Sequence, residues 1–391
     1  MAVKVIISGA GVAGLALAHW LDRIGATSVT VEKAPEFRPV GHYISLKGNG
    51  VEMVRRMGIL ERCEERAAPL AELRMYTADG RFVRSEHTAA LAKALGGYIL
   101  FRRADLQKAL YELVRDRADI RFGVYIEHIE TTVDGVAVRL SDGTVEHADL
   151  VVGADGIHSH VRRLVFGQGF EKPLGGHYIT TTQKLDHGLP PVMHSYLNIG
   201  KMVTLYPVAP DTVSAVAYVG AAAGTPPREG IREYLLDTCA GFPEPVLHVL
   251  KAIAPEDFVY SDVIAQVEMP HITGNRCALI GDAGHCPTFL SGMGSSLALQ
   301  DAHVLAGCLA RTPHDLAAAL AGYETAMAPI ALRYRDNARG AHAVFLTPNR
   351  VTAWLRNLGL RLAPDLVFER GARRFIDAER PLPDLPVGGR T

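Results

Sequence analysis

Near its N-terminus the chain reads VKVIISGAGVAG (residues 3–14), then LALAHWL (residues 15–21), and after a short gap SVTVE (residues 28–32). The first and last segments are rich in β-branched residues and predict two buried parallel strands. The middle segment predicts a helix, so the whole pattern is a strand, a glycine-rich turn, a helix and a strand that ends in an acid. This stretch predicts an α/β fold that binds a dinucleotide.

The glycines of this G-x-G-x-x-G motif have separate physical roles. Gly9 allows the tight turn, Gly11 lets a pyrophosphate approach the backbone, and Gly14 lets the helix pack closely on the strand. The free N–H groups at the helix start would hold the phosphates, and Glu32 would accept hydrogen bonds from ribose hydroxyls. The motif alone does not separate NAD from FAD. The predicted binding residues here are Gly9, Gly11, Val12, Ala13, Gly14, Glu32 and Lys33.

Two later segments repeat the pattern of a strand followed by a polar turn. ADLVVGADGIHSHVR (residues 148–162) predicts a strand over residues 148–152, and RCALIGDAGH (residues 276–285) predicts another strand before Gly281. Asp155 and Asp282 follow these strands and could accept hydrogen bonds from cofactor hydroxyls. Asp155 could instead cap a helix that begins near Ser159.

A glycine turn opens the next predicted helix, which runs from about Ser295 to Ala310. Its N–H groups and the positive end of the helix dipole suit a second oxyanion or a flavin carbonyl. The candidate residues of this turn are Gly292, Met293, Gly294, Ser295 and Ser296.

Taken together, these motifs resemble those of the class A flavoprotein monooxygenases, the para-hydroxybenzoate hydroxylase family. The likeness is strongest to short members such as the tetracycline-inactivating monooxygenases. That family has a GxGxxG, a DG and a GD motif in fixed order, as Gly9–Gly14, Asp155-Gly156 and Gly281-Asp282 are here. The likeness runs from residue 2 to about residue 330. It implies a Rossmann-like FAD-binding domain interleaved with a smaller substrate domain on an antiparallel sheet, and a helical C-terminus.

The resemblance also implies roles for single residues. Arg103 matches a family arginine that precedes a helix and would contact the ribityl or phosphate region of FAD. Lys47 stands where the family often has arginine and would do similar work. Asp282 would bind the ribityl and pyrophosphate part, with residues 292–296 against the isoalloxazine ring. Asp155 is linked in the family to both FAD and the nicotinamide nucleotide.

Two departures from the family pattern lie near the expected flavin. The family usually has proline four residues after the position of His285, but this chain has Phe289 there, with Pro287 displaced. The asparagine that is common after the glycine turn is Ser296. We therefore keep an FAD oxidase or dehydrogenase without oxygen insertion as an alternative. His285 itself is predicted to be a hydrogen-bonded structural residue rather than a catalyst.

The resemblance implies an enzyme that takes NAD(P)H and O2 as co-substrates. A flavin C4a-hydroperoxide would oxygenate a small, aromatic or polyketide-like substrate, while the protein orients the reactants and excludes water. One dinucleotide motif rather than two fits transient docking of NAD(P)H. A flavin halogenase would carry a W-x-W-x-I-P segment, which a chain whose tryptophans are Trp20 and Trp354 lacks. A non-enzymatic flavin or nucleotide sensor remains a third reading. The sequence identifies no catalytic side chain.

Composition bounds the partners. The 391 residues include 41 Lys and Arg against 42 Asp and Glu, a net charge of −1, so no basic excess points to nucleic acid. The five cysteines form no C-x-x-C pair and leave one over, which indicates reduced thiols and a cytoplasmic location. The apolar run of residues 3–20 imitates a signal peptide, but its glycine turns argue against one and against membrane insertion. No histidine has metal-ligand spacing, and we expect a monomer or homodimer.

The motifs suggest an interleaved organisation. The FAD-binding domain would comprise residues 1–72, 98–175 and 262–335, and the substrate domain residues 73–97 and 176–261. C-terminal helices and tail would take residues 336–391. Alternating segments at residues 202–206 and 213–218 predict antiparallel strands with one buried face. Residues 315–345 are helical by period, and the proline-rich tail after Arg380 is expected to be frayed.

Overall fold

The fold is built around a parallel sheet that contains the predicted N-terminal strand. The computed structural model describes residues 3–38, 41–374, 376–377, 379 and 381–385. The sheet has the order β17-β18-β11-β1-β2-β7, and every pairing except that of β17 is parallel. The predicted strand–helix–strand unit is confirmed. Its strands are β1 (Lys4–Ser8), β2 (Thr27–Glu32), β7 (Asp119–Phe122), β11 (Leu150–Gly153), β17 (Thr273–Gly274) and β18 (Cys277–Leu279).

The buried strand predicted over residues 148–152 is confirmed from Leu150 onward as β11, but its predicted start at residue 148 is wrong. Strand β10 (Val145–Ala148) ends one residue before β11 begins, and it belongs to a separate sheet with β8 (Ile126–Thr131) and β9 (Val136–Leu140). Asp149 lies between the two strands and attaches the chain to the start of β1. Its backbone N donates to Lys4 O at 2.9 Å, and its Oδ2 accepts from Lys4 N at 2.8 Å.

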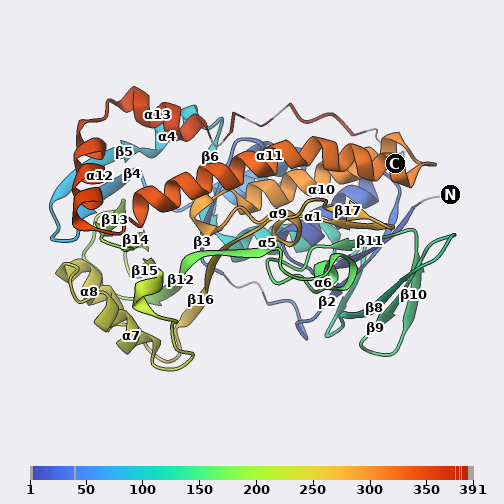
Figure 1. The fold of residues 1–391 in the computed structure, drawn as a ribbon, viewed down its shortest axis with the longest axis horizontal. Helices are drawn as coiled ribbons and strands as arrows, with labels where there is room; N and C mark the ends of the chain where they lie inside the picture. Colours follow the sequence, from blue (N-terminus) through green and yellow to red (C-terminus); the bar gives the residue numbers. More distant parts are fainter. Residues whose placement is uncertain (1–2, 39–40, 375, 378, 380, 386–391) are drawn as a thin grey trace.

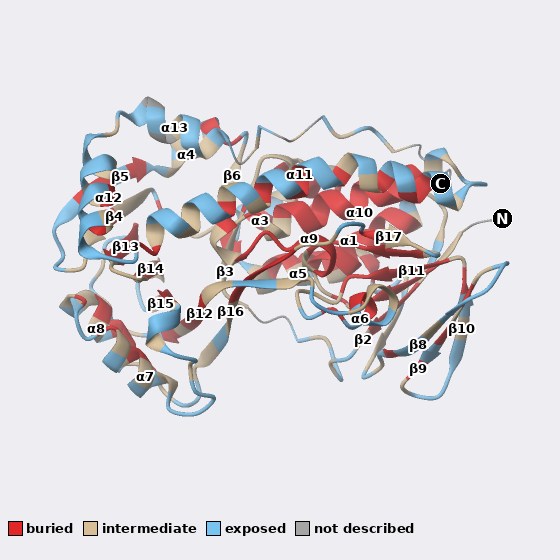
Figure 2. Ribbon diagram, viewed as in Figure 1, coloured by how far each residue is buried: buried red, intermediate tan, exposed pale blue. Residues whose placement is uncertain are grey.

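Long helices cover the parallel sheet. Helix α10 runs beside α1, and α11 continues from the sheet to the far end of the molecule (Figure 1). Every residue of α1 from Val12 to Leu21 is buried, as is every residue of α10 from Ser296 to Leu309 (Figure 2). The predicted helical stretches at 295–310 and 315–345 are confirmed. The helices around this sheet are α1 (Val12–Arg23), α2 (Asn49–Arg56), α3 (Leu60–Glu64), α5 (Arg103–Val114), α6 (His160–Phe166), α9 (Asp282–His285), α10 (Gly294–Arg311) and α11 (Leu316–Phe345).

A second sheet has seven strands in the order β16-β12-β15-β14-β13-β4-β5. All its pairings are antiparallel except that of β4 with β13, so the predicted antiparallel sheet is confirmed. Strands β12 and β16 run through the predicted domain boundaries at 175/176 and 261/262, which stay predictions. The strands are β4 (Glu72–Thr77), β5 (Phe82–His87), β12 (Glu171–Lys184), β13 (Met193–Asn198), β14 (Lys201–Ala209), β15 (Thr212–Val219) and β16 (Phe258–Val267).

The prediction that its central strands expose one face is wrong. Residues on both faces of β15 are buried, from Val213 to Val219. One face packs against α7 (Ile231–Thr238) and α8 (Glu244–Lys251), and the other contributes to an apolar cluster with Ile264 and Leu346. The sheet is therefore a middle layer, and its second face borders the rest of the molecule.

The remaining elements connect the two sheets. Strands β3 (Tyr43–Lys47) and β6 (Tyr98–Arg102) form an antiparallel pair, and α4 (Thr88–Ala94) follows β5. Two short 3₁₀ helices span Ala221–Ala223 and Phe289–Ser291. Helices α12 (Arg350–Leu362) and α13 (Asp365–Arg373) form the predicted helical C-terminus, next to β5 and α4 (Figure 1). Within the described ranges, none of these helices combines the length and apolarity that a membrane crossing requires.

The proline-rich tail is held in place as far as residue 385, so the prediction of a frayed end is wrong there. Arg56 Nη2 donates to Leu382 O at 3.1 Å, and His303 Nε2 lies 2.9 Å from Pro383 O. Leu382 and Leu385 also pack against the main apolar core. Residues 386–391, which the same prediction covered, lie outside the described part of the chain.

Candidate functional site

One cavity of about 1880 Å³ runs between the parallel sheet and the seven-stranded sheet. Most of the predicted cofactor residues line it. These are Gly9, Gly11, Val12, Ala13, Glu32, Lys33, Lys47, Arg103, Asp155, Asp282, Gly292, Gly294 and Ser295. The predicted residues that do not line the cavity are Gly14, Met293 and Ser296, which are buried behind its wall.

The three glycines of the first turn differ in how much space surrounds them: there is room for a side chain at one position and none at the other two. A Cβ on Gly14 would lie 1.9 Å from Gly9 O, and one on Gly9 would lie 2.6 Å from Ala154 O. A Cβ on Gly11 would meet nothing closer than Arg103 Nη2 at 3.8 Å. Gly9 and Gly14 therefore serve the close packing of α1 on the sheet, whereas Gly11 faces free volume at the helix start, where an oxyanion would meet unpaired N–H groups.

Glu32 is fixed at the end of β2 on the cavity wall. Its Oε2 accepts from Ala10 N at 2.8 Å, and its Oε1 accepts from Ala34 N at 2.9 Å. A carboxylate held by two backbone donors keeps lone pairs for ribose hydroxyls, and its contact with the adenosine ribose stays a prediction. Lys33 Nζ lies 5.9 Å from the centre of the Tyr125 ring.

Asp155 caps a helix, which was the alternative reading of its motif. Its Oδ2 accepts from His160 N at 2.7 Å and from Val161 N at 3.1 Å, at the start of α6. Its Oδ1 accepts from Ser159 Oγ. Since Asp155 also lines the cavity, a contact with a nucleotide stays a prediction beside the capping role.

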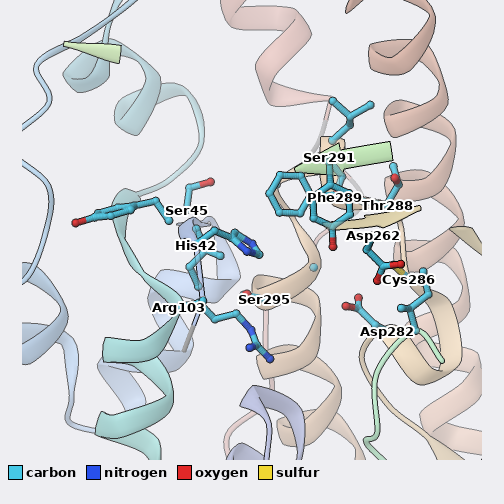
Figure 3. Close-up of a pocket in the computed structure, with 18 of the residues that line it drawn as sticks. His42, Ser45, Arg103, Asp262, Asp282, Cys286, Thr288, Phe289, Ser291 and Ser295 are labelled. Atoms are coloured by element: carbon cyan, nitrogen blue, oxygen red, sulfur yellow. Dashed lines mark hydrogen bonds between the residues drawn. The ribbon is translucent and has the colours of Figure 1, made fainter. Parts of the chain in front are cut away.

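Arg103 and Asp282 face one another across the cavity from α5 and α9 (Figure 3). Removal from bulk water raises the pKa of the Asp282 carboxyl, while a hydrogen bond with the Cys286 thiol and the Arg103 cation act in the opposite direction. Within the described part of the chain no backbone N–H donates to the Asp282 side chain, so this carboxyl does not cap α9. The pair offers one donor group and one acceptor group to a polar chain that bears both phosphate and hydroxyl groups.

The comparisons with known proteins agree with this geometry. Residues 2–236 match the family described as "FAD binding domain". A flavin-dependent monooxygenase of Legionella longbeachae is 31% identical over 314 residues, covering 78% of this chain and 80% of the relative. The chain belongs to the class A FAD-dependent monooxygenases. FAD is its cofactor, as the resemblance implied.

Two solved structures extend the match over nearly the whole chain. The tetracycline destructase Tet(55) has a TM-score of 0.80 at 28% identity, with 98% of this monooxygenase and 99% of that chain covered. Klebsiella pneumoniae HpxO, solved with FAD and uric acid, has a TM-score of 0.84 at 28% identity, covering 96% of this chain and 97% of its own.

The second glycine turn of the monooxygenase holds Lys47 beside it. A Cβ on Gly292 would lie 2.8 Å from Lys47 Nζ, and the backbone N of Lys47 donates to Ser296 Oγ at 3.1 Å. Burial lowers the pKa of Lys47 to about 8. Ser296 thus fastens the strand that carries Lys47 rather than facing the cavity, and direct cofactor contacts of Gly292, Gly294 and Ser295 stay predictions.

An aromatic group next to this turn was not predicted. The ring of Phe289 stacks on Tyr178 at 4.1 Å and meets His42 edge-on at 4.5 Å; Figure 3 shows His42 pointing toward Phe289. Burial, with a smaller contribution from Arg103, lowers the pKa of His42 to about 3, so this ring is neutral at pH 7. The sequence marked Phe289 only as a departure from the family and gave no signal for His42 or Tyr178.

The strain at this corner lies in Thr288, whose φ is 90°. A β-branched residue rarely adopts a positive φ, and Thr288 is buried directly before Phe289 in the 3₁₀ turn. Strain of this kind persists where the surrounding structure enforces it and clusters at functional sites. It fixes the direction in which Phe289 enters the cavity.

Beyond the aromatic group, the cavity is lined mainly by the seven-stranded sheet, together with residues of β6, and is largely apolar. Ser195 and Thr204 form a buried hydroxyl pair in this chamber, with 2.9 Å between their oxygens. Burial raises the pKa of Tyr206 to about 12, so its phenol stays neutral. The other chamber residues include Leu73, Met75, Tyr98, Leu100, Met193, Met202 and Tyr218.

His285 is hydrogen-bonded within the protein, as predicted, and its structural rather than catalytic role stays a prediction. It is buried, and its Nε2 lies 2.7 Å from Asp301 Oδ2. Asp301 also accepts from Gly281 N at 2.7 Å and from the Tyr323 hydroxyl at 3.1 Å. This network holds the loop that carries Asp282, and sequence reasoning missed Asp301 because its partners are distant in the chain. All five cysteines are buried free thiols, and the described residues contain no cluster of metal-ligating side chains.

Proposed function

We propose that this monooxygenase uses NAD(P)H and O2 to insert one oxygen atom into a small, apolar, aromatic substrate. The observation that carries the proposal is the continuity of the cavity from Gly11 to the chamber around Tyr206. Bound FAD supplies the redox chemistry, accepting hydride and activating oxygen. A substrate in the chamber would lie beside the flavin end of the same cavity.

The side chains support this chemistry by binding and by excluding water. The first turn of α1 and the Arg103–Asp282 pair would hold the polar part of FAD, and Lys47 would place a cation beside its ring system. The neutral ring of His42 and the stacked pair Tyr178–Phe289 present apolar surface at the junction with the chamber. A dry junction strengthens electrostatic interactions and limits side reactions with water.

The substrate class follows from the chamber lining. Methionines and tyrosines suit a flat aromatic ring, and the Ser195–Thr204 pair offers hydroxyls to a polar substituent. Uric acid, which is bound in the HpxO structure, and tetracyclines, after which the destructases are named, are ring systems. Compounds of this kind are therefore the first to test as substrates.

Labelled oxygen tests this proposal. Phenols, aromatic polyketides and nitrogen heterocycles are screened for stimulated oxidation of NADH or NADPH, and the product is then made under ¹⁸O2. We expect one labelled oxygen atom in each product molecule. Unlabelled product with a full yield of hydrogen peroxide would instead make the protein an oxidase, the alternative that Phe289 raised. Failure of both nicotinamide nucleotides to reduce the bound flavin would contradict the proposed co-substrate.

Asp282→Ala tests the cofactor role of the third motif. We expect weaker FAD binding, by about 1.5–3 kcal/mol for a lost hydrogen bond to a charged group, and little change in the stability of the FAD-free protein. Thermal melts with and without FAD separate the two effects, because a ligand stabilises only the state that binds it. Asp315→Ala is the matched control, since Asp315 accepts from Ala318 N as the cap of α11 and is not one of the residues that line the cavity. An equal loss with and without FAD in Asp282→Ala would remove this residue from the site.

A further inference from the structure

Helix α12 turns its apolar face outward. Val351, Trp354 and Leu362 are 67%, 62% and 69% exposed, and Leu355 and Leu358 are exposed between them. At 100° per residue these five side chains fall within about 100° of arc on one side of the helix. Helix α12 lies at the end of the molecule opposite the β8–β10 sheet (Figures 1 and 2). A surface helix of a soluble protein normally shows the reverse arrangement.

The inward side of α12 explains why the helix keeps this orientation. Arg356 is buried there and donates to Phe345 O and Thr347 Oγ1, each at 3.2 Å. A capping box at the helix start, formed by Asn349 and Thr352, fixes the first turn. In this orientation the Arg356 guanidinium is hydrogen-bonded to backbone and side-chain oxygens, which keeps the opposite, apolar stripe of α12 facing outward.

The sequence of α12 and α13 carries an excess of positive charge. Residues 350–374 contain six arginines against Asp365 and Glu369, a local net charge of +4 in a chain whose total is −1. Arg350 and Arg361 are exposed and lie beside the apolar stripe on α12, and Arg370 and Arg373 are exposed on α13, the next helix in the chain. A two-fold contact with a second copy of this chain would set this basic region against itself. A partner that complements this region must offer apolar groups to the exposed side chains of α12 and negative charge to the arginines.

We propose that α12 and α13 form a docking surface for an anionic lipid bilayer. Helix α12 would lie in the plane of the interface with Val351, Trp354, Leu358 and Leu362 among the acyl chains, and the arginines would contact lipid phosphates. Trp is the side chain that favours this interfacial depth. No helix crosses the bilayer in this arrangement, so the attachment is peripheral and reversible.

The proposed docking surface lies where the cavity opens to the outside, which suggests a path for substrate into the cavity. Leu355 is exposed on the stripe and also lines the cavity, as do Leu360 and Val367. The cavity thus reaches the molecular surface at the helix that would rest on lipid. On the proposed function, an apolar substrate dissolved in the bilayer could pass into the chamber without crossing water.

Vesicle binding by the FAD-loaded, full-length protein tests the surface without any turnover. Vesicles of phosphatidylcholine alone are compared with vesicles that contain about 30% phosphatidylglycerol, in the range of anionic membranes. We expect co-flotation with the anionic vesicles and release as salt rises. Trp354 is a built-in reporter: its emission should shift to the blue on binding, whereas Trp20 is buried and should not respond. Trp354→Phe should keep the flotation and lose the shift.

Matched variants locate the contact. The triple variant Trp354→Ser, Leu358→Gln, Leu362→Gln changes only exposed side chains that lie off the cavity wall, and should reduce anionic-vesicle affinity at least about tenfold. The double variant Arg350→Glu, Arg361→Glu should do the same at low salt. The control Val133→Ser, Val145→Ser removes two exposed apolar side chains near the β8–β10 sheet and should bind like the parent. Melting temperature and bound FAD check that each variant is folded.

Several results would overturn the proposal. One is a protein that binds neither kind of vesicle. Another is a triple variant that still floats with the anionic vesicles. Concentration-dependent dimers that the triple variant abolishes, seen by sedimentation velocity without vesicle binding, would assign the stripe to a second copy of the chain. None of these readouts depends on substrate oxidation, so failure of the surface and failure of the proposed activity remain separate.

Discussion

Asp301→Ala is expected to lower the free energy of unfolding by about 3–5 kcal/mol, the range for removing one partner of a buried charged network. Asp301 is fully buried, and alanine would leave Gly281 N and the His285 ring without their acceptor. Tyr323 would keep its bond to Leu279 O at 2.9 Å. Because Gly281 directly precedes Asp282, FAD affinity should fall as well.

Urea denaturation of the FAD-free protein measures this loss. Asp315→Ala is the control, because it removes a carboxylate from an exposed helix cap and should cost about 1 kcal/mol. If the two variants lose the same stability, the Asp301 network is not the structural support that its burial indicates.

Gly11→Val should abolish retention of FAD while the fold survives. The backbone at Gly11 has φ −78° and ψ −169°, an extended conformation that valine adopts readily. Its side chain would enter the free volume at the start of α1 and displace the pyrophosphate. We expect a loss of FAD affinity of at least about 100-fold, or roughly 3 kcal/mol, measured by fluorescence titration.

Gly14→Ala is the counterpart of this variant. Its methyl group would overlap Gly9 O, so α1 must move from the sheet, and such overpacking costs about 1–3 kcal/mol or more in stability. The pair separates binding from packing: Gly11→Val should melt like the parent without FAD, and Gly14→Ala should melt lower. Equal FAD affinity in Gly11→Val and the parent would make the motif purely structural.

The sequence could predict what is local. The strand, turn, helix and strand from Lys4 to Glu32 are contiguous, and each glycine reports its own backbone requirement. The three motifs then identified the family and its FAD-binding fold, which the comparisons confirm. Asp155 shows the limit of this reasoning, because a strand followed by aspartate suits a helix cap and a cofactor contact equally well.

What the sequence could not predict depends on distant partners. The parallel pairing of β4 with β13 joins segments with no shared motif. The stack of Phe289 on Tyr178 brings a loop of the FAD-binding region against a strand of the second sheet. Periodicity also assigns α12 an apolar face without saying what covers it, and for β15 it does not reveal that α7 and α8 cover one face of the strand.

The order of strands in the parallel sheet has a consequence for synthesis of the protein. β1 emerges from the ribosome before the other strands of this sheet, yet one of its neighbours is β11, at residues 150–153, and the next strand outward is β18, at residues 277–279. Because non-local pairings of parallel strands form late, the apolar edge of the growing sheet stays unpaired until β18 has been synthesised.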